Sequence, residues 1–239
     1  MSKTILIKAK DRGHADHGWL NAHHMFSFAN YYNPEQMGFG TLRVLNDDVI
    51  QGGTGFSTHP HNNMEIITVP LKGAIRHRDS MGNEGVIESG EVQVMSAGMG
   101  ILHSEMNGLS KEETNITQIW VIPNKQNVHP RYDQIKFSFE PNNLQQIVSP
   151  NPDDEGSWIY SDSWFNHGVY DAGSTFTYDL HLQENGLFVF VIEGLLEVQG
   201  QKLEARDGFG IEGQNTVDFK VNQDSRFLLL EVPMNVGPN

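Results

Sequence analysis

The stretch THPHNNMEIITVPLKG, residues 58–73, places two histidines just before an apolar run that ends in glycine. Side chains on a β-strand alternate between its two faces, so residues two apart point the same way. His59 and His61 therefore project together and can converge on one metal ion. Pro60 between them lacks an N–H group, which predicts an edge strand or a β-bulge at this point.

A second stretch, ILHSEMN at residues 101–107, repeats this spacing with His103 and Glu105. Roughly forty residues separate the two pairs, which is enough for a few strands of ordinary length. In a barrel such strands can return to face each other. Three imidazoles and one carboxylate would then make a four-ligand metal site, although each pair alone is a weak signal.

The composition limits the classes of protein and of site. The chain has 239 residues, of which 38% are hydrophobic, and this allows one large all-β domain or two of ordinary size. Disulfides and thiolate zinc sites are excluded because there is no cysteine. The formal net charge of −14 opposes direct contact with nucleic acid or with an anionic membrane surface.

The location of the protein is predicted from its apolar runs. The N-terminal residues show no signal-peptide pattern, and the longest apolar runs, such as LFVFVI at 187–192, are too short to span a bilayer. We therefore expect no membrane association and a cytoplasmic protein.

Many short segments have strand character, among them TLRVL at 41–45 and EVQVM at 91–95. Turn signals such as MGNEG separate them, which predicts an all-β sandwich or barrel. No long segment has the 3.6-residue apolar period of a helix, and at most one helical turn is expected, at Asn33–Pro34.

A weak internal repeat divides the chain. EIITVPLKGAIRH (65–77) and GLFVFVIEGLLEV (186–198) are each an apolar strand, a glycine and a second strand. This predicts two related β-barrels in tandem. The turn-rich segment SPNPDDEGS (149–157) marks the boundary, so we expect a metal-binding domain at 1–148 and a second domain at 149–239.

The second barrel lacks histidines at the matching positions. Counting back from Gly194 as from Gly73, the residues equivalent to His59 and His61 are Leu180 and Leu182. We therefore expect an apolar interior and no metal in this barrel.

The glycines around the histidines extend the pattern to two motifs. The first consists of Gly53, His59, His61, Glu65 and Gly73, and the second of Gly90, Gly98, His103 and Asn107. Both resemble the motifs of the cupin superfamily. Glu65 comes one residue earlier than in that pattern, Ser96 replaces a proline, and His103 comes two residues late.

These departures are themselves similar to those of the pirin family, a group of two-cupin proteins. The resemblance rests on two stretches, residues 58–73 and VQVMSAGMGILHSEMN at 92–107. MFSFANYYNPEQMGFGTLRVLNDD, residues 25–48, resembles the bacterial pirin-like proteins, some of which are quercetin 2,3-dioxygenases. The resemblance is strong from about residue 18 to 123 and looser beyond.

The resemblance implies a fold of two tandem cupin domains, each a jelly-roll β-barrel, and one metal site. Its ligands would be His59, His61, His103 and Glu105, with Glu105 also acting as the catalytic base. Glu65 is the alternative carboxylate ligand. It lies four residues after His61, so on a continuous strand the two side chains would point to the same face. The metal would be a divalent ion, with Fe(II) favoured and Zn, Cu, Ni, Mn or Co as alternatives.

The implied activity is the cleavage of flavonols such as quercetin by dioxygen, with loss of carbon monoxide. Pirins also include transcriptional co-regulators. The alternative is therefore a non-enzymatic metal-binding regulatory or redox-sensing protein that acts through a protein partner.

Three further features are interpreted from the sequence alone. His24, Phe26 and Phe28 alternate and line either a pocket mouth or one face of a strand. Pro70 predicts a local bulge. Histidines without a partner pattern are interpreted as surface residues: His14, His17, His129 and His167.

Overall fold

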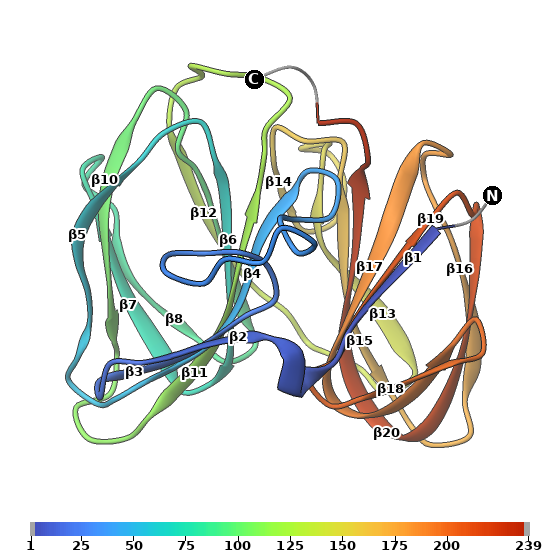
Figure 1. Cartoon of the computed structure of the whole chain (residues 1–239). Coiled ribbons are helices and arrows are strands. Elements are labelled where there is room, and N and C mark those ends of the chain that lie inside the picture. The colour runs from blue at the N-terminus through green and yellow to red at the C-terminus, as the bar shows by residue number, and fades with distance from the viewer. Residues whose placement is uncertain (1–2, 237–239) are drawn as a thin grey trace.

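The computed structural model describes residues 3–236 and consists of β-strands with one short 3-10 helix, η1 (Ala9–Asp11). Two barrels stand side by side (Figure 1). The strands of the N-terminal barrel are β2 (Gly13–Asp16), β3 (Leu20–His24), β4 (Leu42–Ile50), β5 (Gly55–His61), β6 (Glu65–Lys72), β7 (Ala74–Asp79), β8 (Glu84–Glu88), β9 (Glu91–Ser96), β10 (Ile101–Asn107), β11 (Thr114–Val121) and β12 (Arg131–Lys136).

The C-terminal barrel is built from the remaining strands. They are β1 (Lys3–Ile7), β13 (Asn143–Ser149), β14 (Ser157–Trp158), β15 (Trp164–Tyr170), β16 (Thr175–Asp179), β17 (Asn185–Val198), β18 (Gln201–Glu204), β19 (Gly208–Glu212) and β20 (Thr216–Pro233). The predicted fold of two tandem cupin domains is confirmed.

Two sheets enclose the N-terminal barrel. One has seven strands in the order β12-β9-β6-β11-β4-β3-β2, and the other has four in the order β5-β10-β7-β8. A nine-stranded sheet forms the C-terminal barrel, with β1-β19-β17-β20-β15-β13-β14 as its main path. β5 is an edge strand, as Pro60 predicted, because an edge position tolerates a residue that cannot donate to the ladder.

The seven-stranded sheet has one face toward its own barrel and one toward the other barrel. On β6, Ile67 and Val69 belong to a buried cluster that also contains Phe188 and Phe190 of β17. Thr68, between them, points the opposite way and contacts Glu105. The strand is therefore almost wholly buried, and its alternation separates the apolar interface between the barrels from the interior of the N-terminal barrel, toward which Ile66 and Thr68 point.

The interior of the C-terminal barrel is largely apolar, as the sequence predicted, but it also holds a buried carboxylate, Glu231, which accepts a hydrogen bond from the hydroxyl of Tyr178 at 2.9 Å. Fifteen buried residues form one cluster, including Leu187, Val189, Phe219 and Phe227. The only two with polar atoms in their side chains are Tyr170 and Tyr178.

Local irregularities follow the residues that cause them. The pairing of β11 with β6 shifts register where Asn115 faces Lys72 and Ile116 faces Pro70, which is the bulge that Pro70 predicted. Gly73 has a positive φ of 79°, and a Cβ there would lie 2.5 Å from Oγ1 of Thr114. Glycine is therefore required at this corner.

Three expectations differ from the structure. The predicted boundary after residue 148 falls inside β13, which pairs with β15 of the C-terminal barrel. β1, at the start of the chain, also pairs with a strand of that barrel, β19. By strand pairing, the C-terminal barrel therefore includes residues 3–7 and 143–148. Asn33–Pro34 start no helix but a single turn between β3 and β4, in which N of Gln36 donates to the carbonyl oxygen of Asn33 at 3.0 Å. His167 is not a surface residue but only 1% exposed, stacked on Phe139 at 4.0 Å.

Candidate metal centre

β5 and β10 bring three of the predicted ligands together. They are antiparallel neighbours in the small sheet, and His103 is paired directly with His59. The Nε2 atoms of these two residues lie 3.0 Å apart. His61, two residues along β5, completes a group in which one ligand nitrogen of each residue lies within 4.8 Å of the others.

The ring of His59 is fixed in one tautomer by the backbone. Its Nδ1 lies 2.8 Å from the carbonyl oxygen of Ser57. A carbonyl can only accept, so Nδ1 carries a hydrogen, and Nε2 is the ring nitrogen that faces His103. This arrangement, with one ring nitrogen held by the backbone and the other free to coordinate, is typical of histidine ligands.

The other two imidazoles are held in the neutral form. Burial, and then the charges of His103 and His59, lower the pKa of His61 to about 4. Burial, and then the charge of His59, lower the pKa of His103 to about 3. Nε2 of His61 is buried and has no hydrogen-bond partner among the described residues. Neutral imidazoles with converging nitrogens suit a divalent metal ion, so the residues fit the predicted group.

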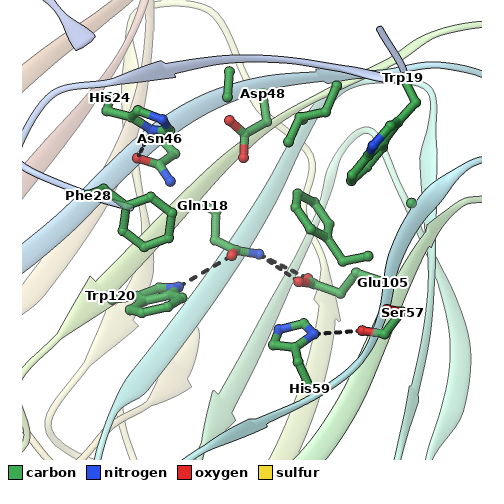
Figure 2. A pocket seen from close by; sticks show the side chains of 14 residues that line it. Trp19, His24, Phe28, Asn46, Asp48, Ser57, His59, Glu105, Gln118 and Trp120 are labelled. Carbon is green, nitrogen blue, oxygen red and sulfur yellow. Dashed lines mark hydrogen bonds between the residues drawn. The ribbon is translucent and has the colours of Figure 1, made fainter. Parts of the chain in front are cut away.

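Glu105 lies beside the triad on β10 but outside that closest group. Two residues of β5, Ser57 and Thr58, face the single residue Ser104, and this bulge pairs Glu105 with Phe56. Glu105 is 1% exposed. Its carboxylate faces the same cavity as His59 (Figure 2).

Hydrogen bonds orient the carboxylate of Glu105. Nε2 of Gln118 donates to both of its oxygens, at 2.8 and 3.0 Å, and Oγ1 of Thr68 donates to Oε1 at 3.1 Å. Nε1 of Trp120 in turn donates to Oε1 of Gln118 at 3.3 Å. Because Trp120 occupies the amide oxygen, the amide nitrogen of Gln118 is turned toward Glu105 (Figure 2).

Glu65, the alternative ligand, points away from the triad. Its Oε2 accepts a hydrogen bond from Oγ of Ser96 at 2.6 Å, on the face of β6 that Ile67 and Val69 present to the other barrel. The parity argument for Glu65 was wrong because β5 ends at His61 and β6 begins at Glu65. The turn between them, with Asn63 at φ 45°, resets the alternation.

A cavity of about 410 Å³ opens beside His59 and Glu105. Aromatic side chains form much of its wall: Trp19, Phe28, Phe56 and Trp120. The polar lining residues come from five strands: His24 on β3, Asn46 and Asp48 on β4, Ser57 and His59 on β5, Glu105 on β10 and Gln118 on β11 (Figure 2). A mostly apolar cavity of this size with a few directed polar groups is typical of a small-molecule site.

Comparison with known proteins agrees with this geometry. Residues 7–121 match the family model described as pirin, and residues 146–232 match the model of the quercetinase C-terminal cupin domain. A quercetin 2,3-dioxygenase of Escherichia coli strain K12 is 40% identical over 95% of this chain and 98% of that protein. The chain belongs to the pirin family.

Other pirin-like proteins support the assignment. A pirin-like protein of Caulobacter vibrioides is 42% identical, over 92% of this chain and 95% of that protein. The crystal structure of a bacterial pirin from Escherichia coli in complex with nickel(II) is 39% identical, with a TM-score of 0.92 over 97% of this chain and 99% of that one.

Several residues of this pirin site were missed from the sequence. Asp48, Gln118 and Trp120 belong to no histidine motif, and each becomes part of the site only through the pairing of β4 and β11. The alternation of His24 and Phe28 did give a usable signal, since both line the cavity, while Phe26 is buried against Phe188. Within residues 3–236, no helix is long and apolar enough to cross a membrane.

Proposed function

We propose that this pirin is a metal-dependent dioxygenase that cleaves flavonols such as quercetin, with His59, His61, His103 and Glu105 as the metal ligands. The observation that carries the proposal is the convergence of three imidazoles, with the carboxylate of Glu105 beside them, at an aromatic-lined cavity. The relatives named quercetin 2,3-dioxygenase support the same substrate class.

The metal ion, when bound, supplies a positive centre that attracts substrate oxygens and brings in dioxygen chemistry. Three neutral imidazoles leave most of the charge of the cation in place. Glu105 is the base in this proposal, and it accepts the proton of the flavonol hydroxyl that faces the histidines. Gln118 holds the carboxylate in position through its two hydrogen bonds.

The cavity walls bind and orient the rest of the substrate. Trp19, Phe28, Phe56 and Trp120 present apolar surfaces to a flat aromatic ligand. They also exclude water from the buried carboxylate, which strengthens the electrostatic interactions of Glu105.

The test measures dioxygen uptake, carbon monoxide release and bleaching of quercetin by the metal-loaded protein. His59→Ala should abolish all three, and Glu105→Gln should lower the rate by about 10²- to 10⁴-fold, the usual contribution of a general base. Glu65→Gln is the matched control, because Glu65 is buried but faces Ser96. Absence of dioxygen uptake by fully loaded protein would refute the proposal.

The same assay distinguishes a dioxygenase from the alternative, a non-enzymatic regulator. A non-enzymatic regulator acting through a protein partner would bind the metal but consume no dioxygen with any flavonol. Iron as the resident metal, the cytoplasmic location and a protein partner stay predictions.

A further inference from the structure

Asp48 is a buried acid that the proposed chemistry does not use. It lies on β4, is 3% exposed and lines the cavity. Its Oδ1 has no hydrogen-bond partner among the described residues, and only its backbone oxygen accepts a bond, from Nδ2 of Asn115. A buried carboxyl without a hydrogen-bond partner lowers the stability of the protein by about 1–3 kcal/mol. Such a group on a cavity wall is therefore expected to bind a ligand.

The position of Asp48 sets it apart from the proposed ligands. In Figure 2 it projects into the cavity from the wall opposite Glu105 and His59. Strand alternation puts Asn46 on the same face of β4, two residues away. Oδ1 of Asn46 accepts from Nδ1 of His24 at 2.9 Å, which leaves the amide nitrogen as a donor.

The chemistry of Asp48 suits a hydroxyl group. Burial, and then the charges of Asp47 and Glu105, raise its pKa well above the ordinary range. A neutral carboxyl both donates and accepts a hydrogen bond, as a phenolic hydroxyl also does. A charged ligand gains no ion pair from a neutral carboxyl, and an apolar ligand would leave it unpaired.

We propose that Asp48, with Asn46, forms a subsite that recognises a hydroxyl on the part of the flavonol remote from the histidines. The subsite selects polyhydroxylated flavonols. It discriminates against flavonols that carry no hydroxyl besides the one that, with the neighbouring carbonyl, faces the metal. This inference rests on the proposed function, since it takes the flavonol as the occupant of the cavity. Asp48 is a specificity residue here, and the proton transfer belongs to Glu105.

The experiment compares quercetin with 3-hydroxyflavone, which has the same hydroxyl and carbonyl pair but no other hydroxyl. Binding to the zinc-loaded protein is followed without turnover by quenching of tryptophan fluorescence, because Trp19 and Trp120 line the cavity. Asp48→Leu keeps the branched shape, with methyl groups in place of the carboxyl oxygens, and removes the hydrogen bonds. Asp48→Asn keeps the volume and the ability to donate and accept. Zinc content and thermal unfolding establish that each variant is folded.

The wild-type protein should bind quercetin at least about tenfold more tightly than 3-hydroxyflavone, because one satisfied hydrogen bond is worth about 1.4 kcal/mol. Asp48→Leu should bring this ratio close to one by weakening quercetin alone, and Asp48→Asn should keep most of it.

An unchanged ratio in Asp48→Leu would overturn the inference and mark a buried water as the partner of Asp48. A wild-type ratio near one would overturn it without any variant, so the test survives a variant that fails to fold. If the zinc-loaded wild type binds neither flavonol, the proposed function fails as well. If the zinc-loaded wild type binds both flavonols with equal affinity and the iron-loaded protein cleaves them, only the role of Asp48 is lost.

Discussion

Replacing Gln118 with leucine tests whether the carboxylate of Glu105 is a metal ligand held in place by its neighbours. The change removes both hydrogen bonds that Nε2 donates to Glu105, at 2.8 and 3.0 Å, and leaves only the bond from Thr68. Hydrogen bonds to a charged group are worth about 1.5–3 kcal/mol each. Part of this is recovered when the carboxylate turns to a new partner, so the full sum is not expected.

The affinity for a divalent metal should therefore fall by about 10- to 100-fold, which equals about 1.4–2.7 kcal/mol and is the usual effect of losing an outer partner of a ligand. The assay is competition for nickel(II) or zinc(II) against a chromogenic chelator. Trp120→Phe should have a smaller effect, because it removes only the 3.3 Å bond that orients the amide.

The control is Thr117→Val, one residue away on β11. Thr117 is 0% exposed and its hydroxyl has no hydrogen-bond partner among the described residues, so its removal should leave metal affinity unchanged. If Gln118→Leu binds the metal within about twofold of the wild type, below the range for an outer partner, then Gln118 does not position a ligand. Glu105 would then have to be assigned another role.

Three further changes test the fold and its buried acid and base. Phe188→Ala should lower the free energy of unfolding by about 3–5 kcal/mol in urea denaturation. The ring centroid of Phe188 lies 5.3 Å from that of Phe26 and 5.5 Å from that of Phe39 at the interface of the barrels, and these contacts are lost. A loss of stability below about 1 kcal/mol would contradict this. Burial raises the pKa of Glu65 from 4.5 to about 7, so its neutral form stabilises the fold at low pH, and this contribution is lost as the pH rises from 4.5 to 7. Between pH 5 and 8, Glu65→Gln should gain stability relative to the wild type by up to about 3 kcal/mol, and a constant difference would refute the shift. Burial lowers the pKa of His167 from 6.5 to about 3, so the wild type loses stability as the pH falls below 6.5. Between pH 7.5 and pH 5, the free energy of unfolding of His167→Leu should therefore rise by up to about 2 kcal/mol relative to that of the wild type. Equal pH dependence of the two proteins in denaturation experiments would argue against this shift.

The fold was largely predictable because its signals are local. Alternating apolar segments and turn residues predict strands, and Gly73 and Gly194 mark corners with positive φ in both barrels. The boundary was harder to predict, because β1 and β13 join the C-terminal sheet through pairing with β19 and β15. Pairing between distant segments leaves no trace in the spacing of either segment.

Within the site, the sequence alone determined that His59 and His61 share a face, as do His103 and Glu105, because the two-residue period of a strand is a property of the backbone. Tertiary structure decided the rest. The turn at Asn63 removed Glu65 from the site by resetting that period. The lateral order of β3, β4, β11 and β6 carried Gln118 to Glu105 and placed Asp48 on the opposite wall. Hydrogen bonds between strands set that order, and they join backbone groups that every residue except proline carries alike.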